Sequence, residues 1–175
     1  HLISEEYLGL IGLLQNLSLV LVSLPALGLS SLLLRYFSTW KQTSRLAQFN
    51  AVSLWLMSLA LILFALLFFL FRQPIIDYYK THSSLFIPYY YLVVPLVAIL
   101  AFTQYFEMFS MVNLRVAVPA FIREILLRLL LIGLVYLFIY HWLSETQFVI
   151  GFVAVYFIAF AILALYAFFV LRCKA

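Results

Sequence analysis

The sequence predicts an all-α protein, a polytopic transmembrane bundle of five helical spans, and three observations support this fold class. The 175-residue chain is 68% hydrophobic and only 9% charged, whereas soluble domains are about 45–50% apolar and about 25% charged. Apolar runs of about 20 residues, the length that crosses a bilayer as a helix, recur along the whole chain. Basic residues are concentrated in alternate connections between these runs, as in multi-pass membrane proteins.

The five predicted spans are residues 8–34, 51–71, 85–110, 121–140 and 147–171. The connections between them are residues 35–50, 72–84, 111–120 and 141–146. No internal repeat, linker or low-complexity stretch divides the chain. We therefore interpret residues 1–175 as a single transmembrane domain.

Local signals support the ends of individual spans. Ser4, followed by two glutamates, is typical of a helix N-terminus, because the helix dipole favours acids in the first turn. Ser144 and Gln147 fit a capping box at the start of the last span. Pro119 lies where the fourth span begins, a position at which proline loses no hydrogen bond.

The distribution of lysine and arginine predicts the orientation. Two basic residues fall on one side of the predicted membrane, Arg72 and Lys80. The other eight fall on the opposite side, at Arg35, Lys41, Arg45, Arg115, Arg123, Arg128, Arg172 and Lys174. The side richer in basic residues is predicted to be cytoplasmic, so the chain begins outside and ends inside.

The first span differs from the others in its small and polar residues. Several of them fall near one helical face, namely Gly12, Asn16, Ser23, Ala26 and Ser30, with Gln15 beside them. Such residues face protein or water rather than lipid, so this face either packs closely on another helix or lines a lumen. Pro25 lacks a backbone donor and is predicted to bend the helix or to break a hydrogen bond around residues 21–25.

The third span carries Gln104 and Glu107 near its cytoplasmic end. An ionisable group at membrane depth is costly and needs a partner. Glu107 therefore either lies at the interface or pairs with an arginine. Arg115 follows eight residues later and would share its face if the helix continued.

Residues 115–128 form the most charged segment. Glu124 and Arg128 have the spacing and order of a favourable i,i+4 helix pair. Arg123 has no such partner in the sequence pattern, and arginines bind phosphates well through forked hydrogen bonds. A cytoplasmic arginine at a helix start is, however, more often an anchor.

No arrangement suited to catalysis or to a cofactor is visible. The sequence has no Gly-rich phosphate loop, no His-Glu metal pair and no Ser-His-Asp set of plausible geometry. Cys173 is the only cysteine, so an intrachain disulfide and a cysteine-based metal site are excluded. The three histidines are far apart and outside the apolar runs, at His1, His82 and His141. We expect a non-enzymatic chain with no cofactor and no metal, and no nucleic-acid partner, since no basic cluster extends beyond the helix ends.

Three segments resemble the bacterial polysaccharide transporters, or oligosaccharide flippases, of the multidrug/oligosaccharidyl-lipid/polysaccharide exporter superfamily. Residues 2–10 (LISEEYLGL) resemble the stretch that leads into the second helix of that family, and residues 27–37 (LGLSSLLLRYF) resemble the end of that helix. Residues 118–128 (VPAFIREILLR) resemble the segment before its fifth helix. The resemblance covers nearly the whole chain and implies helices two to six of an N-terminal six-helix lobe.

What the resemblance implies is a flippase that moves polyprenyl-pyrophosphate-linked oligosaccharide, such as O-antigen of lipopolysaccharide or capsule units, across the bacterial inner membrane by alternating access. The implied partners are this lipid-linked oligosaccharide, membrane lipids, and the missing first helix and second lobe of the same parent chain. The resemblance favours a lumen position for Asn16, Ser23 and Ser30. It makes Arg35 the first candidate to bind the anionic pyrophosphate and Arg123 the second.

Two other functions stay open. A small-molecule or drug exporter on the same scaffold often uses a buried acid for ion coupling, and the predicted spans hold no acid at mid-membrane. A membrane glycan polymerase or ligase needs large outer loops rich in acids or arginines. The predicted outer connections are short, and Arg72 and Lys80 are their only basic residues.

Overall fold

The computed structural model describes residues 5–26, 28, 35–36, 46–82, 84–140 and 142–172, and nearly all of them are helical. No strand occurs among these residues, so the predicted all-α class is confirmed. Several residues named above lie outside the described ranges, namely His1, Ser4, Ser30, Lys41, Arg45, His141, Cys173 and Lys174.

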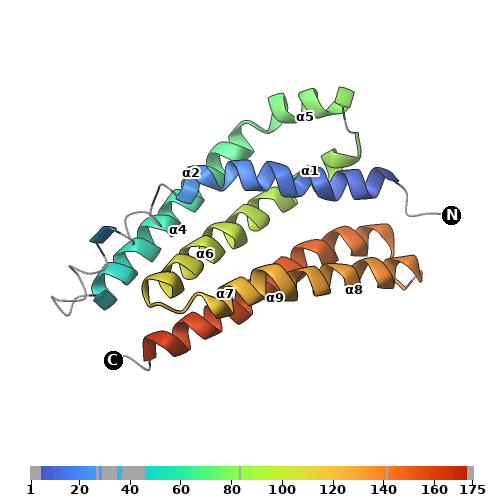
Figure 1. Ribbon diagram of the computed structural model, residues 1–175. Helices are drawn as coiled ribbons and strands as arrows, with labels where there is room; N and C mark the ends of the chain where they lie inside the picture. The colour runs from blue at the N-terminus through green and yellow to red at the C-terminus, as the bar shows by residue number, and fades with distance from the viewer. Residues whose placement is uncertain are drawn as a thin grey trace.

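The described part of the first predicted span consists of α1 (Glu5–Leu21) and α2 (Ser23–Ala26). The helix is interrupted at Val22, which confirms the break predicted there. The cause is Pro25, whose nitrogen carries no hydrogen to donate to the Leu21 carbonyl. α2 nevertheless continues in the direction of α1 (Figure 1).

The second predicted span is α4 (Leu46–Leu70). The chain then turns at Phe71 and enters α5 (Arg72–His82), so the connection predicted after this span is largely helical. α5 is more polar than its neighbours and carries an exposed ion pair, with Lys80 Nζ 2.8 Å from Asp77 Oδ1. Its polarity is why the sequence pattern excluded it from the spans.

The third predicted span begins as a 3₁₀ helix, η1 (Ser84–Leu92), and continues as α6 (Val93–Val112). Pro88 lies inside η1 and cannot donate an α-helical hydrogen bond. α6 ends before Leu114, whose backbone is left-handed with a φ of 60°. The helix therefore does not continue to Arg115, and that residue does not extend the polar face of α6.

The fourth predicted span is a helical run of three parts, α7 (Ala117–Phe121), the π-turn η2 (Ile122–Leu126) and α8 (Leu127–Ile139). It begins four residues before the predicted start at residue 121, with Pro119 in its first turn, where the missing donor costs no hydrogen bond. The charged segment predicted at the helix start therefore lies within the helix.

The last predicted span is α9 (Glu145–Arg172). Its predicted capping box is confirmed. The Ser144 backbone nitrogen donates to Gln147 Oε1 at 2.9 Å, and the Gln147 nitrogen donates to Ser144 Oγ at 3.4 Å. These reciprocal bonds satisfy backbone donors that a helix start leaves free.

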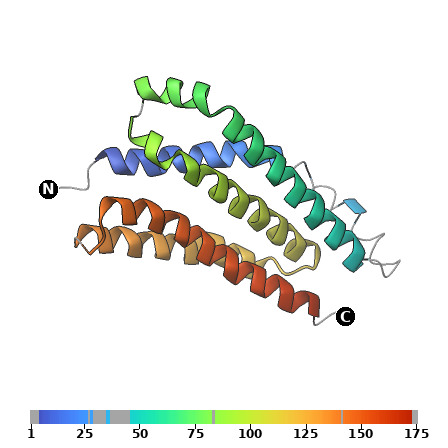
Figure 2. The same ribbon diagram turned by 180° about the vertical axis from the view of Figure 1, so that it is seen from behind.

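The helix α6 lies at the centre of the bundle. It packs along α9 on one side and along α1 on the other, while α8 packs on α9 and α2 packs on α4 (Figures 1 and 2). Half of the residues in an 18-residue apolar stretch of Leu85–Val112 are buried, against 28% in the corresponding stretch of Gln48–Leu70. One hydrophobic core joins α1, α4, η1 and α6, and a second joins α6 to α8 and α9.

Four helical segments in the described part of the chain are long and apolar enough to cross a membrane, namely Gly9–Ala26, Gln48–Leu70, Leu85–Val112 and Glu145–Phe169. They coincide with the first, second, third and fifth predicted spans. The run of residues 117–139 is not among them, because every 18-residue stretch of it contains three charged residues, Arg123, Glu124 and Arg128.

Candidate functional site

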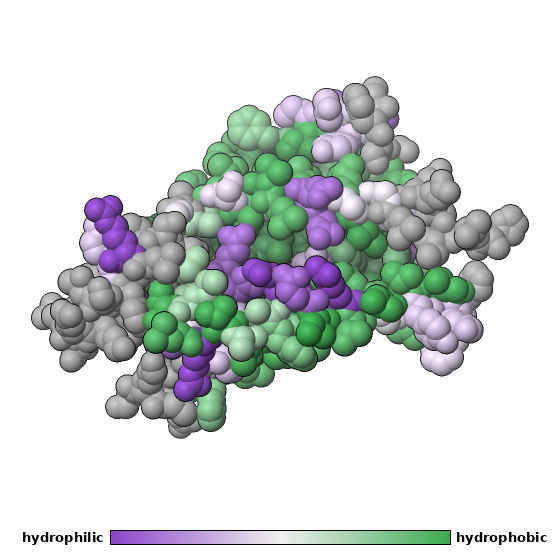
Figure 3. Space-filling model, viewed as in Figure 1, coloured by the Kyte–Doolittle hydropathy of each residue, from purple (hydrophilic) through white to green (hydrophobic). Residues whose placement is uncertain are grey.

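A cavity of about 490 Å³ lies between α1, α6, the η2–α8 segment and α9. Its volume is within the range of about 300–1,000 Å³ that is typical of small-molecule sites. Figure 3 shows hydrophilic atoms gathered between α1 and the α7–α8 segment, on a face that is otherwise largely hydrophobic. The polar lining residues are Gln15, Thr103, Gln104, Glu107, Arg123, Glu124, Arg128 and Tyr156.

Helical spacing explains how the sequence brings these side chains to one place. Gln15 and Leu19 are four residues apart and lie on one face of α1. The central helix α6 contributes a stripe at intervals of three and four residues, Leu100, Thr103, Gln104 and Glu107. Each of these two helices therefore turns a single stripe toward the cavity.

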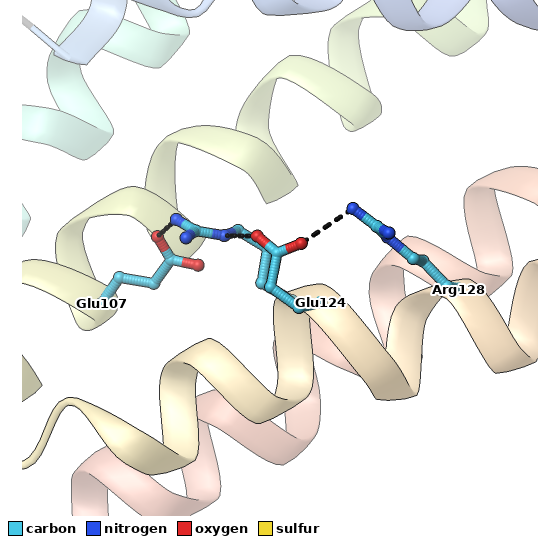
Figure 4. A network of polar contacts seen from close by, with 4 residues as sticks. Glu107, Glu124 and Arg128 are labelled. Carbon is cyan, nitrogen blue, oxygen red and sulfur yellow. Dashed lines mark hydrogen bonds and ion pairs between the residues drawn. The ribbon is translucent and has the colours of Figure 1, made fainter.

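Four of the lining residues form a continuous chain of ion pairs. Arg123 Nη1 lies 3.4 Å from Glu107 Oε2, and Arg123 Nε lies 3.1 Å from Glu124 Oε1. Arg128 Nη2 then lies 2.8 Å from the second oxygen of Glu124. Figure 4 shows this chain running from Glu107 on α6 to Glu124 and Arg128 on the neighbouring helix. Opposite charges alternate along it.

The predicted i,i+4 pair of Glu124 and Arg128 is confirmed. Arg123 has no i,i+4 partner, as the sequence pattern indicated, but Glu107 and Glu124 both contact its guanidinium. Glu107 comes from another helix, and helical spacing within one segment does not show a contact of this kind. The same contact identifies Arg123 as the partner that an acid in the third span requires.

The local backbone at this site is unusual. Arg123 and Glu124 lie in η2, a single π-turn inside a longer helical run. Such turns are rare and often occur at functional sites. Both of these residues line the cavity.

The structure places three other predicted binding residues, Arg35, Asn16 and Ser23, outside this cavity. The Arg35 side chain is exposed, with its guanidinium carbon 5.7 Å from the centre of the Tyr36 ring, a cation–π geometry. Asn16 and Ser23 are also exposed and are not lining residues. Ser23 Oγ donates to the Val20 carbonyl oxygen at 2.8 Å. Of the four candidates within the described residues, Arg123 alone lines the cavity, and Ser30 lies outside those residues.

Two lining residues that were not predicted to bind a ligand, Gln15 and Gln104, do have a signal in the sequence. Gln15 of α1 and Gln104 of α6 are amides inside apolar runs, where polar groups face protein or water. The sequence pattern groups Gln15 with the face of Asn16. In the structure Gln15 lines the cavity and Asn16 does not, because adjacent residues of a helix point about 100° apart. Tyr156 carries no such signal, because tyrosines are frequent throughout this chain.

A second polar cluster is buried and joins two helices. The hydroxyl of Tyr105 on α6 donates to Oδ1 of Asn50 on α4 at 3.2 Å, and both residues are buried. Ser53, one turn after Asn50, is buried as well. Asn50 Nδ2 is buried with no hydrogen-bond partner among the described residues. This cluster links α4 to the central helix and lies apart from the cavity lining.

No group of three or more histidine, cysteine, aspartate or glutamate side chains within the described ranges is placed to hold a metal ion. Comparisons with known protein families, with curated proteins and with solved structures give no match to this chain. The function must therefore be argued from the cavity, the apolar surface and the sequence segments themselves.

Proposed function

We propose that this chain crosses a membrane five times and forms part of a flippase that moves polyprenyl-pyrophosphate-linked oligosaccharide across the bacterial inner membrane by alternating access. In this proposal the helical run of residues 117–139 is the fourth crossing in chain order, in addition to the four long apolar segments. The observation that carries the proposal is an open cavity with charged residues in its wall, between helices that expose large apolar side chains.

The exposed surface supports a membrane location. Large apolar side chains of α4 face outward, and Trp55 and Leu70 are 73% and 75% exposed. α8 and α9 also expose large hydrophobic residues, including Leu129 and Leu165. Water-soluble proteins rarely expose apolar patches of this extent, because their contact with water is unfavourable. Lipid chains would cover these faces at no such cost.

The depth of the charged residues supports a transport role. Arg128 lies eleven residues after Ala117, which places it about 16 Å along the helical run at a rise of about 1.5 Å per residue. A bilayer core is about 30 Å thick. Ionisable residues at such depth are rare and usually mark a substrate or ion pathway.

The resemblance supplies the substrate class. Three of the four charged residues of the cavity wall, Arg123, Glu124 and Arg128, lie in the segment 118–128, one of the three that resemble oligosaccharide flippases. Arg123 lines the cavity. Arg35 lies in residues 27–37, the segment that resembles the end of the second helix of that family. Asn16, Ser23 and Ser30 stay candidates for a lumen face on the first span. In a flippase these groups would contact the head of the lipid-linked oligosaccharide while its lipid tail stays in the bilayer.

Inactivation of the complete reading frame that encodes this chain tests the proposal. We expect lipid-linked oligosaccharide to accumulate in the inner leaflet of the inner membrane, measured by its resistance to a membrane-impermeant glycan-modifying reagent added from outside. A polymerase or ligase would instead leave single units in the outer leaflet. A drug exporter would give drug sensitivity with normal glycan. Either of those two results would refute the flippase assignment.

Arginine variants then test the binding residues in the same strain. Arg35→Gln and Arg123→Gln should each abolish glycan export at matched protein levels. Arg35→Lys should abolish it as well, if the contact is a forked one that an ammonium cannot reproduce. Arg72→Gln, in the polar helix α5, is the matched control and should export normally. Full export by Arg35→Gln would remove that residue from the substrate site.

A further inference from the structure

We infer that the cavity beside Arg123 recognises the uncharged sugar hydroxyls of its ligand rather than the pyrophosphate. This inference rests on the proposed function, and it changes the role first expected of Arg123. The observation behind it is the balance of charge in the cavity wall, where two arginines and two glutamates alternate in one chain of contacts.

Charge balance disfavours an anionic ligand at this place. The Arg123 guanidinium already contacts a carboxylate on each side, at 3.4 and 3.1 Å. A phosphate that approached Arg123 would meet the like charges of Glu107 and Glu124 at almost the same distance. It would bind only by displacing one carboxylate from a charge-assisted bond and leaving that acid without its partner. A site built for phosphate would leave its arginines uncompensated.

Hydroxyl groups fit the same wall without displacing any contact. A guanidinium has five N–H donors, and the contacts to Glu107 and Glu124 use two of those on Arg123. Each carboxylate keeps lone pairs that accept hydrogen bonds from hydroxyls. A sugar hydroxyl both donates and accepts, so neighbouring hydroxyls can bridge an arginine and a glutamate of the chain.

The rest of the lining has the mixed character that a sugar ring requires. The side-chain amides of Gln15 on α1 and Gln104 on α6 each offer donors and an acceptor to the cavity. Leu100, Leu127 and the Tyr156 ring provide apolar surface for the C–H groups of a sugar. The volume of about 490 Å³ admits a ligand of small-molecule size.

Binding measurements on the purified chain in lipid nanodiscs test this inference. Saturation-transfer NMR with a mixture of glucose, galactose and N-acetylglucosamine should show transfer from the protein to at least one sugar at millimolar concentration. Inorganic pyrophosphate at the same concentration should not reduce the transfer. Displacement of the sugars by pyrophosphate, or no transfer to any of the three sugars, would overturn the inference.

A charge-altering variant makes the test specific. The double substitution Glu107→Gln and Glu124→Gln leaves both arginines uncompensated, so pyrophosphate affinity should rise by about tenfold and sugar transfer should fall. Asp77→Asn removes an exposed acid from α5 and is the matched control, with no change expected in either ligand. Circular dichroism verifies the helix content of each variant. Where the double variant fails to fold, Gln104→Leu serves instead, and it should lose sugar transfer without gaining pyrophosphate binding.

The outcomes separate this inference from the proposed function. Glycan accumulation in the inner leaflet together with pyrophosphate binding at the cavity would keep the flippase and reject the sugar site. Sugar binding together with normal glycan export in the inactivated strain would keep the site and reject the flippase.

Discussion

The guanidinium of Arg123 donates a hydrogen bond from Nη1 to Oε2 of Glu107 at 3.4 Å, and so ties the π-turn of the fourth helical run to the central helix α6. The Glu107 side chain is 17% exposed and that of Arg123 is 59% exposed. The acid is thus the inner partner and the arginine the outer one. The two residues lie on consecutive helical elements joined by residues 113–116, so this contact exists only when those elements pack against each other.

The energetic coupling of this pair can be measured with a double-mutant cycle. The free energy of unfolding of Glu107→Gln, Arg123→Gln and the double variant should give a coupling of about 0.2–1 kcal/mol, because Arg123 is largely exposed. The same cycle on Asp77 and Lys80, an ion pair exposed on both sides, is the control and should give a smaller value. Titration with sodium dodecyl sulfate in mixed micelles reports these energies. Equal coupling in the two pairs would contradict a special role for the inner acid.

Cysteine labelling can distinguish five crossings from four. In a Cys173→Ser background, single cysteines replace Asp77 in α5, Leu114 before α7 and Ser144 before α9, all of which are exposed. An impermeant maleimide added to intact cells should label positions 77 and 144 but not position 114. Position 114 should stay unlabelled because it lies on the side of the predicted membrane that is richer in lysine and arginine, and this side is retained in the cytoplasm. Labelling of positions 114 and 144 from the same side would show that residues 117–139 do not cross.

The buried bond between Tyr105 and Asn50 should stabilise the contact of α4 with α6. Tyr105→Phe leaves the Asn50 amide without its partner, and the free energy of unfolding should fall by about 0.5–1.5 kcal/mol. Adding Asn50→Leu removes the unpaired polar group and should restore much of this loss, because two apolar partners leave nothing unsatisfied. A double variant less stable than Tyr105→Phe alone would argue against this hydrogen bond as the cause.

Gly151 is required where α9 packs on α8. A Cβ atom built there would lie 2.7 Å from Cδ1 of the buried Leu134, so Gly151→Ala should destabilise the chain by about 1–3 kcal/mol. Gly133→Ala is the control on α8, since its Cβ would meet nothing within 4 Å. That variant should be neutral or slightly stabilising, because alanine favours the helix over glycine. Thermal unfolding of both variants measures the difference, and Leu134→Ala should relieve the defect at Gly151→Ala.

The interruption at Val22 should depend on Pro25. Pro25→Ala restores a backbone donor to the Leu21 carbonyl, so the helix should continue from α1 into α2. Hydrogen exchange followed by NMR should then show a protected amide at position 25 and slower exchange at position 22. Rapid exchange at the new amide, with the rest of α1 protected, would mean that another contact imposes the break.

Much of the fold follows from the sequence because each signal is local. Long apolar runs predicted the helices, and Ser144 and Gln147 predicted the start of α9, since a capping box involves only neighbouring residues. Pro25 predicted a break for the same reason, as proline acts on its own turn. The helix α5 and the π-turn were not predicted. α5 packs on η1, and the side chains of the π-turn pair with α6, so in each case the partner comes from another element.

The sequence by itself therefore determined an all-helical chain, the place of most helices and the Glu124–Arg128 pair, because apolar periodicity and i,i+4 spacing are properties of a single segment. The tertiary structure decided which polar residues meet. It brought Gln15, Glu107 and Arg123 from three helices to one cavity and left Asn16 and Arg35 outside it. Helix rotation and packing set which stripe of each helix faces inward, and these depend on contacts between segments far apart in the chain.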